Sequence, residues 1–567
     1  MKNKIKYLLL MLILLILLLI INTKNIVDFI EYIGVQINYK ENLTEFFRSK
    51  LLLLIVLLSL LLLYNIYHKF IINIYHKFLQ IINKIELKKL FPLLILITII
   101  YLITLIILSV KNYDLGFDEA WYINYAENFS LKGFPYYTHN ESCAMIDFIT
   151  MIPYYIVYFI YRLFFDSSLI GIKIISWLLS VSGLGMIFLI SKKQNNLFFA
   201  FFVILFIVLQ PGFGFVASSF FGEILSIGLV FLAADMFFRK NLNLWPAIWF
   251  SVAIHTKFQL FPIIILLLFI MFLKTLDKRI IIQIIYILVL ILFIAILRLL
   301  PAIIYDDNNI ILVIKQFYNM TYNGTSSNIV FFDRIQLFNR FFPLMIFLFS
   351  IIFSIPDLKS KFNQFIYGFA FILIVYWIFF FKFTTYRHLF MGIIPLLYIL
   401  VLALSNIYKL LINKYKLQKT FLSKFIIIFS LLLFLLYGTS TNIIYAMTGY
   451  NDGVQFDLSG FKSRLFYPAK NNNYQKDFFV RTKKIIDSND IIFSKSPIII
   501  KAYLNNKVYN FNYIKKTKSS GKKYIIIGID TFPDGNFNEA FKRLKALKVN
   551  YKLIYKNNGY VLLKLCD

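Results

Sequence analysis

Two adjacent carboxylates, Asp118 and Glu119, lie a few residues beyond a long apolar run at 91–110. A carboxylate just outside a bilayer can take the proton of an acceptor hydroxyl as a general base. Two carboxylates together can also supply oxygen ligands to a divalent cation. A third interpretation is structural, with Asp118 capping a helix and Glu119 in its first turn. The sequence leaves these alternatives open, and a cap and a base are compatible.

Lys257 separates two short apolar halves, 244–256 and 260–273. Interrupted membrane helices expose helix ends and often mark ligand sites. A cation there would pair well with a phosphate at the membrane interface, although a lysine can also extend its amine to lipid headgroups. His255 is two residues away and is a further candidate, with a packed interfacial histidine as the alternative.

Arg387 lies within a Tyr386-Arg387-His388 triplet that precedes another apolar run. The planar guanidinium can bind phosphate oxygens through two parallel hydrogen bonds, and an interfacial anchor is the alternative. Glu223 begins the apolar run 219–238, where a carboxylate is favoured by the helix N-terminus or could act directly on a substrate. These residues indicate a site that places acids near a nucleophile and cations near a phosphate.

The composition indicates what kind of chain positions these residues. Of 567 residues, 60% are hydrophobic and only 15% are charged, whereas soluble domains contain about 25% charged residues. This excludes a soluble enzyme, a disordered protein and a fibrous protein, and it predicts an α-helical polytopic membrane protein. The formal net charge is +31, but the basic residues lie between apolar runs, which is typical of membrane topology and not of nucleic-acid binding.

Windows of about 20 apolar residues are needed to cross the hydrocarbon core. They predict about thirteen crossings near 7–22, 50–67, 91–110, 169–190, 197–216, 219–238, 244–256, 260–273, 280–300, 338–355, 362–380, 389–406 and 425–441. The first follows three lysines but lacks a small-residue cleavage site, so we interpret it as an uncleaved anchor.

The apolar stretch 147–165 decides the orientation of everything after it. If it crosses, the following basic loops fall outside, and if it does not cross, they fall inside as the positive-inside rule requires. These loops contain Lys192-Lys193, Arg239-Lys240, Lys278-Arg279 and the segment 409–424. We therefore predict a juxtamembrane or re-entrant helix at 147–165, with the acidic loop 111–146 on the extracytoplasmic side.

Three regions follow from this topology. Residues 1–90 hold an additional pair of spans and a basic cytoplasmic loop, and residues 91–441 form the main membrane domain. Residues 442–567 are polar and form a small extracytoplasmic α/β domain, with predicted strands at 490–494, 507–511, 524–529, 551–555 and 560–565 and helices at 477–486 and 539–547. The two cysteines, Cys143 and Cys566, exclude a disulfide scaffold and a cysteine-built metal site, while a bridge between them stays open.

The order and sidedness of these motifs resemble the GT-C glycosyltransferases that use polyprenyl-phosphate sugars, in particular the protein O-mannosyltransferase and aminoarabinose transferase group with its Rgt-like relatives. The matching features are the segment 117–122, Glu223, the short turn at Thr256-Lys257, and Arg387-His388. The resemblance covers roughly 91–567 and implies a GT-C fold.

The resemblance also implies roles. The residue matching Asp118 is the expected catalytic base, and the cations matching Lys257 and Arg387 would hold the lipid phosphate. It implies a multi-pass enzyme of the bacterial cytoplasmic membrane, acting outside on a protein, lipid or glycan hydroxyl with inversion. Asp147 stands where close relatives carry a different pattern, so it is either a second acidic ligand or a cap, and the enzyme would need either no cofactor or a divalent cation.

Two other functions fit part of the pattern. A ligase or polymerase that moves whole glycans from a diphosphate lipid would share the outer site and its basic residues. A transporter or flippase would also have many spans, but it usually shows repeated groups of spans, and none is visible here.

Overall fold

The computed structural model describes most of the chain after the first two predicted spans. The described residues are 87–112, 122–123, 126–127, 136–139, 143–146, 152–165, 169–210, 212–239, 244–305, 334–335, 338, 342, 344–379, 386–415, 423–424, 426–430, 474–494, 500, 503–504, 506–510, 513–514, 517, 521–528, 537–557 and 559–566. The predicted spans at 7–22 and 50–67 lie outside them.

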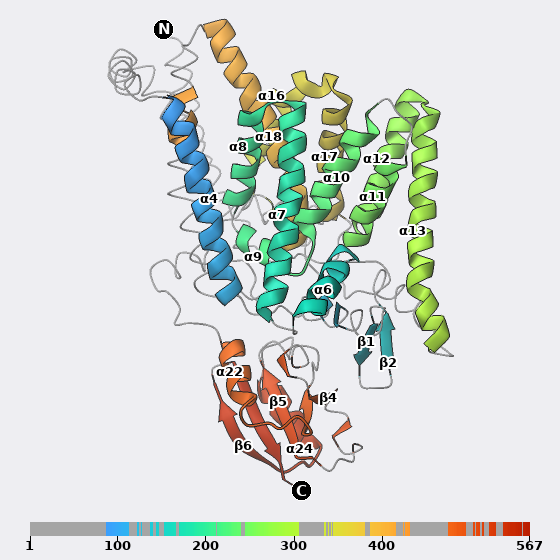
Figure 1. Cartoon of the computed structure of the whole chain (residues 1–567), viewed down its shortest axis with the longest axis vertical. Helices are drawn as coiled ribbons and strands as arrows, with labels where there is room; N and C mark the ends of the chain where they lie inside the picture. Colours follow the sequence, from blue (N-terminus) through green and yellow to red (C-terminus); the bar gives the residue numbers. More distant parts are fainter. Residues whose placement is uncertain are drawn as a thin grey trace, which may run out of the picture.

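Helices dominate the membrane domain and run alternately up and down (Figure 1). They are α4 (Leu87–Asn112), α6 (Ile152–Phe164), α7 (Leu169–Gln194), α8 (Leu197–Leu209), α9 (Phe213–Ser218), α10 (Glu223–Phe237), α11 (Trp245–Thr256), α12 (Leu260–Thr275), α13 (Lys278–Tyr305), α16 (Leu344–Ser354), the 3-10 helix η1 (Ile355–Lys359), α17 (Lys361–Phe379) and α18 (Tyr386–Tyr415). Among the described residues, four helices are long and apolar enough to cross a membrane, and they contain Leu90–Val110, Ile170–Gln194, Lys361–Phe379 and His388–Asn413. The predicted α-helical membrane fold is confirmed.

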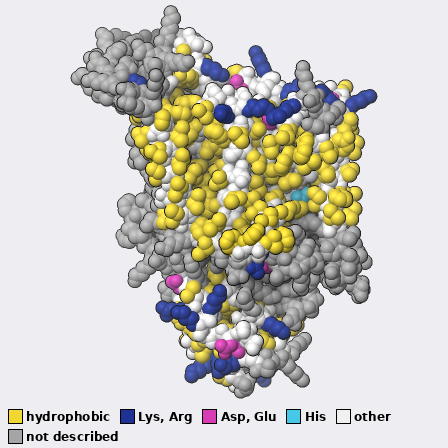
Figure 2. All heavy atoms as spheres, in the orientation of Figure 1, with side chains coloured by type: hydrophobic (Ala, Val, Ile, Leu, Met, Phe, Trp, Pro, Cys, Tyr) yellow, Lys and Arg dark blue, Asp and Glu magenta, His cyan; other side chains and the backbone are white. Residues whose placement is uncertain are grey.

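On the face shown in Figure 2, apolar side chains form a broad yellow band across the bundle, with dark-blue basic side chains along its upper edge. Leu93, Leu292 and Phe293 are among the exposed members of this band. A water-soluble protein would not expose a continuous apolar surface of this size. The band therefore has the character of a lipid-facing surface.

The segment 197–216, predicted as one span, is not one continuous helix. The segment forms two helices, α8 and α9, and the break falls at Gln210, which has an extended backbone with ψ 133°. Pro211 follows, and a proline disfavours helical geometry in the residue before it. Gly212 then adopts a left-handed φ of 78° that suits glycine.

Helix α6 lies at the end of the bundle where α4 ends and α7 begins (Figure 1). Its 13 residues extend about 20 Å at 1.5 Å per residue, which is shorter than the roughly 30 Å hydrocarbon core. Tyr161 packs against Gly171 of α7, where an added Cβ would meet the tyrosine ring. A helix of this length and place leaves α4 and α7 antiparallel.

Close contacts hold α7 against its neighbours. Gly183 and Gly228 lie where α7 crosses α10, and a Cβ at Gly228 would fall 2.5 Å from the Gly183 carbonyl oxygen. Trp177 Nε1 donates a 2.7 Å hydrogen bond to Ser109 Oγ of α4, and Ser180 Oγ donates to the carbonyl of Ala217 after the break at 210–212. These contacts make α7 the central helix of the part that positions the site.

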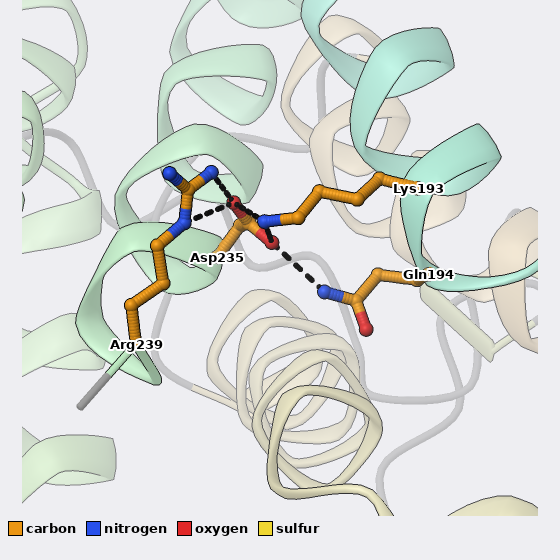
Figure 3. A network of polar contacts seen from close by, with 4 residues as sticks. All are labelled: Lys193, Gln194, Asp235 and Arg239. Carbon is orange, nitrogen blue, oxygen red and sulfur yellow. Dashed lines mark hydrogen bonds and ion pairs between the residues drawn. The ribbon is translucent and has the colours of Figure 1, made fainter.

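A buried carboxylate joins α7 and α10 at the upper end of the bundle. Both oxygens of Asp235 accept 2.7 Å hydrogen bonds from Lys193 Nζ, and Gln194 and Arg239 donate to the same carboxylate (Figure 3). Nearby, the buried Tyr398 hydroxyl of α18 accepts a hydrogen bond from the Asn195 side chain. Helix α18 is therefore also joined to the polar contacts at this end of the bundle.

The tail is a five-stranded mixed sheet in the order β4-β3-β5-β7-β6. Its elements are α22 (Tyr474–Thr482), β3 (Ile491–Ser494), β4 (Lys507–Asn510), β5 (Lys523–Gly528), α24 (Phe537–Ala546), β6 (Tyr551–Lys556) and β7 (Tyr560–Leu565). Strands β4 and β5 are parallel to β3, while β7 is antiparallel to both β5 and β6. These elements confirm the predicted α/β tail to within a few residues. A further antiparallel pair, β1 (Tyr136–His139) and β2 (Cys143–Ile146), lies in the predicted outer loop.

Candidate functional site

Glu223 and Lys257 form an ion pair inside the membrane domain. Lys257 Nζ lies 2.8 Å from Glu223 Oε1, and the two side chains are 2% and 0% exposed. Sequence reasoning assigned both residues to one candidate site but did not predict that they pair with each other. The tertiary fold brings the start of α10 and the end of α11 together, and the two charges meet there.

The local backbone explains why these residues occupy helix ends. Gly222 has a left-handed φ of 77° and immediately precedes α10, so Glu223 lies in the first turn of the helix. Lys257 follows the last residue of α11 with an extended backbone, and its N–H donates to the Ala253 carbonyl. An anion at a helix N-terminus and a cation at a helix C-terminus are each stabilised by the helix dipole.

Aromatic rings connect this pair to the start of α18. Lys257 Nζ lies 5.9 Å from the centre of the Phe221 ring, a favourable cation–π geometry. Phe221 packs on Phe215 of α9. Phe213, also of α9, packs on Phe390 of α18. The ion pair and the first turn of α18 therefore belong to one end of the bundle.

Two buried histidines accompany this end. His255 is 1% exposed and lies two residues before Lys257, and His388 is 5% exposed in the first turn of α18. Tyr386 and Arg387 open the same helix, but their side chains lie outside the described residues. The predicted approach of Arg387 to the donor phosphate stays a prediction.

Lys173 is a candidate that sequence reasoning missed. It lies in the first turns of α7 and is 2% exposed. The available signal was a lysine within the predicted span 169–190, since charges at membrane depth are costly and commonly functional. Its place near the start of α7 adds a cation to the end of the bundle that holds Lys257.

Glu127 forms a second polar contact at this end. The Tyr158 hydroxyl of α6 donates to Glu127 Oε1, and Arg162 Nε lies 3.4 Å from Glu127 Oε2. Glu127 belongs to the predicted acidic loop, so α6 holds one point of that loop in place. Sequence reasoning could not find these partners because nothing in the spacing relates residue 127 to residues 158 and 162.

Asp118, Glu119 and Asp147 lie outside the described residues, so their predicted roles stay predictions. Within the described part of the chain, no group of three or more His, Cys, Asp or Glu residues is arranged to hold a metal ion. The alternatives of a divalent cation and no cofactor stay predictions. The described part of this end holds the buried Glu223–Lys257 ion pair, with His255 two residues before the lysine, and Lys173 is buried near the start of α7.

No protein-family model matches the sequence, and no curated protein matches it. Solved structures do match. ArnT from Cupriavidus metallidurans bound to undecaprenyl phosphate superimposes with a TM-score of 0.57 at 12% identity, covering 83% of this chain and 97% of that chain. The apo structure of the same ArnT gives a TM-score of 0.54 at 13% identity, with the same coverage. The chain therefore has the ArnT-type fold, as its resemblance to the GT-C group implied.

Proposed function

We propose that this chain is an integral membrane glycosyltransferase that moves a sugar from a polyprenyl-phosphate donor to an acceptor hydroxyl on the extracytoplasmic side. The observation that carries the proposal is the buried Glu223–Lys257 pair at one end of an ArnT-type bundle. The ArnT structure bound to undecaprenyl phosphate supports a lipid phosphate as the donor class.

A buried ion pair contributes little net stability to the packing of two helices. The desolvation of both charges commonly exceeds their mutual attraction, and an apolar pair would serve as well or better for stability alone. Ionisable groups within membrane helices instead mark binding and reaction sites by default. We therefore assign the pair a chemical task.

That task is to stabilise a phosphate. An ammonium has three donors, and Glu223 engages one side of Lys257. Glu223 thus fixes the position of the amine, and the positive charge held there would attract the phosphate of the donor. Arg387, and Lys173 as a further cation, would add positive charge where negative charge grows on the leaving phosphate.

The reaction follows from these roles. Asp118 takes the proton of the acceptor hydroxyl as its oxygen attacks the anomeric carbon. The new carbon–oxygen bond forms as the anomeric carbon–phosphate oxygen bond breaks, and the bonding electrons leave with the polyprenyl phosphate. Attack from the face opposite the leaving group inverts the configuration. Glu119 is the neighbouring carboxylate and supports the charge or position of this base.

The experiment is donor turnover by the purified full-length protein with radiolabelled polyprenyl-phosphate sugars. Asp118→Asn should lower transfer by about 10²–10⁴-fold, the usual contribution of a general base, with an unchanged unfolding temperature. Asp114→Asn, in the same acidic loop, is the matched control and should retain activity. Near-normal transfer by Asp118→Asn would remove that residue from the role.

The assay also separates the other functions. Movement of the donor across a membrane without release of polyprenyl phosphate would indicate a transporter. Transfer only of whole glycans from a diphosphate lipid would indicate a ligase or polymerase. Turnover that is lost in EDTA and restored by a divalent cation would establish the metal requirement, and full turnover in EDTA would establish the cofactor-free enzyme.

The membrane orientation and the substrates need their own measurements. Reporter fusions at Lys193 and Arg239 should locate these residues in the cytoplasm, with fusions after residue 442 on the extracytoplasmic face of a bacterial cytoplasmic membrane. Mass spectrometry of envelope glycans and lipids from a deletion strain should show one missing sugar mass. The species that loses it identifies the acceptor.

A further inference from the structure

The tail carries more positive charge than the proposed reaction requires. Residues 442–567 contain 22 Lys and Arg against nine Asp and Glu, a formal net charge of +13. Positive-inside bias acts on short loops, and long domains cross a membrane largely regardless of charge. Membrane topology therefore does not explain this excess.

The strand register gathers lysines at one end of the sheet. Lys507 begins β4 and Lys523 begins β5, and both are paired with Ile491, the first residue of β3. The three strand starts therefore form one row across the sheet, with a lysine on each side of Ile491.

The next row adds two lysines on the other two strands, at the same end of the sheet but on its opposite face, because successive residues of a strand point to opposite faces. Lys552 of β6 lies directly opposite Lys564 of β7, and Lys564 lies opposite Tyr524, one residue beyond Lys523. Like charges on directly opposed residues destabilise a sheet. The chain therefore places Lys552 and Lys564 opposite each other at a cost to its own stability, which favours an anionic ligand.

Exposed lysines in neighbouring turns add to these two rows. They are Lys483, Lys484, Lys522 and Lys548. Among the described residues at this end, two carry carboxylates, and one of them, Asp490, is buried and accepts the backbone N–H groups of Asp487 and Lys522. Asp487 is exposed, 4.0 Å from Lys522. We name this surface the basic end: Lys483, Lys484, Lys507, Lys522, Lys523, Lys548, Lys552 and Lys564.

The basic end faces away from the membrane domain. β7 ends beside the C-terminus, which is marked at the end of the molecule farthest from the helices (Figure 1). Dark-blue side chains are also visible on this lowest part of the surface (Figure 2). Anionic headgroups of the bilayer that holds the helices would approach from the other side, so they do not suit this surface.

The surface also exceeds the size of one small anion. Neighbouring strands lie about 4.8 Å apart, so five strands spread the lysines over roughly 19 Å. Arginine binds both carboxylate and phosphate through paired hydrogen bonds, whereas lysine binds phosphate as a point charge and needs no fixed geometry. The described cations of the basic end are all lysines.

We propose that the basic end binds an extended polyanion that carries repeated phosphate groups, such as an envelope polymer on the extracytoplasmic side. The proposal rests on the proposed function only for the side of the membrane on which the tail lies. The tail would hold such a polymer on the side that faces away from the membrane, and would keep it bound close to the protein.

The test uses full-length protein in detergent and fluorescently labelled inorganic polyphosphate, with binding followed by anisotropy. The double variant Lys522→Gln/Lys552→Gln should weaken binding by about tenfold or more. The matched control is Lys542→Gln/Lys556→Gln, which removes two exposed lysines from α24 and from the other end of β6. Binding should also weaken steeply with added salt, as expected for counterion release.

Several results would overturn the proposal. An equal loss in both double variants would mean diffuse charge attraction without a site. Equal affinity for polyglutamate of matched charge would remove the phosphate preference, and stronger binding to anionic lipid vesicles would assign the surface to a membrane. Absence of polyphosphate binding would end the proposal outright. None of these results depends on catalysis, because the measurement needs no donor and can be repeated with Asp118→Asn.

Discussion

Helix α10 carries a buried carboxylate at each end, and the two are held in different ways. Glu223 at its start meets Lys257, and both side chains are removed from solvent. Asp235 in its last turn is equally buried, but Lys193 and Arg239, which neutralise it, are 48% and 54% exposed. The two carboxylates are separated by about 18 Å along the helix.

This contrast separates a structural task from a chemical one. Lys193 and Arg239 extend their charged ends to water, so little is lost in bringing them to Asp235, and several donors satisfy the carboxylate. Lys257 has no such access to solvent, so its charge is stabilised by groups inside the protein, and Glu223 is one of them. We therefore interpret the Asp235 cluster as a clamp between α7 and α10, and the Glu223 pair as part of a site.

Lys257→Met should have the largest effect. It leaves Glu223 buried without its charge partner, which typically costs about 3–5 kcal/mol, and the protein should unfold at a clearly lower temperature in detergent. Adding Glu223→Gln should recover much of this stability, because no isolated charge is then buried, without recovering sugar transfer. If the double variant transfers sugar normally, the pair has only a structural role.

Asp235→Asn should cost less, about 1.5–3 kcal/mol for weakened hydrogen bonds to charged groups. The two cations can turn to water, and asparagine still accepts a hydrogen bond. Thermal unfolding should show the loss, while turnover per folded molecule should stay unchanged. A drop in turnover beyond the loss of folded protein would contradict the structural interpretation of this end.

Gly228→Ala tests whether the two ends are independent. The new Cβ would meet the backbone of Gly183 and push α7 from α10, with an overpacking cost of about 1–3 kcal/mol. The Asp235 contacts across α7 and α10 should weaken, whereas the Glu223–Lys257 contact lies between α10 and α11 and should persist. The control is Gly185→Ala on α7, where an added Cβ meets nothing within 4 Å. Double-mutant cycles with Asp235→Asn and Glu223→Gln measure the difference.

Lys193→Gln should have the smallest effect, about 0.2–1 kcal/mol, as for other exposed ion pairs. Salt screens exposed charges, so the gap between this variant and the unchanged protein should shrink in unfolding experiments at high ionic strength. The cost of Lys257→Met should respond far less to salt. Equal salt responses at the two ends would falsify the distinction between them.

Local pattern determined much of the architecture. The positions of α7, α10, α12 and α17 follow from runs of apolar residues, because a bilayer requires long apolar helices whatever their neighbours. The tail elements follow from short apolar strands separated by turn residues. The break between α8 and α9 was also encoded locally, in Pro211 and Gly212, but a hydropathy window averages across it.

The sequence by itself thus determined that the chain is a multi-helix membrane protein with an α/β tail, and it selected Glu223 and Lys257 as unusual. Only the tertiary structure decided that these two residues neutralise each other, that Glu127 contacts α6, and that lysines from four strands share one end of a sheet. The physical reason is that helix and strand formation depend on neighbours in the chain, whereas charge pairing depends on distances that exist only after helices cross and strands adopt their register.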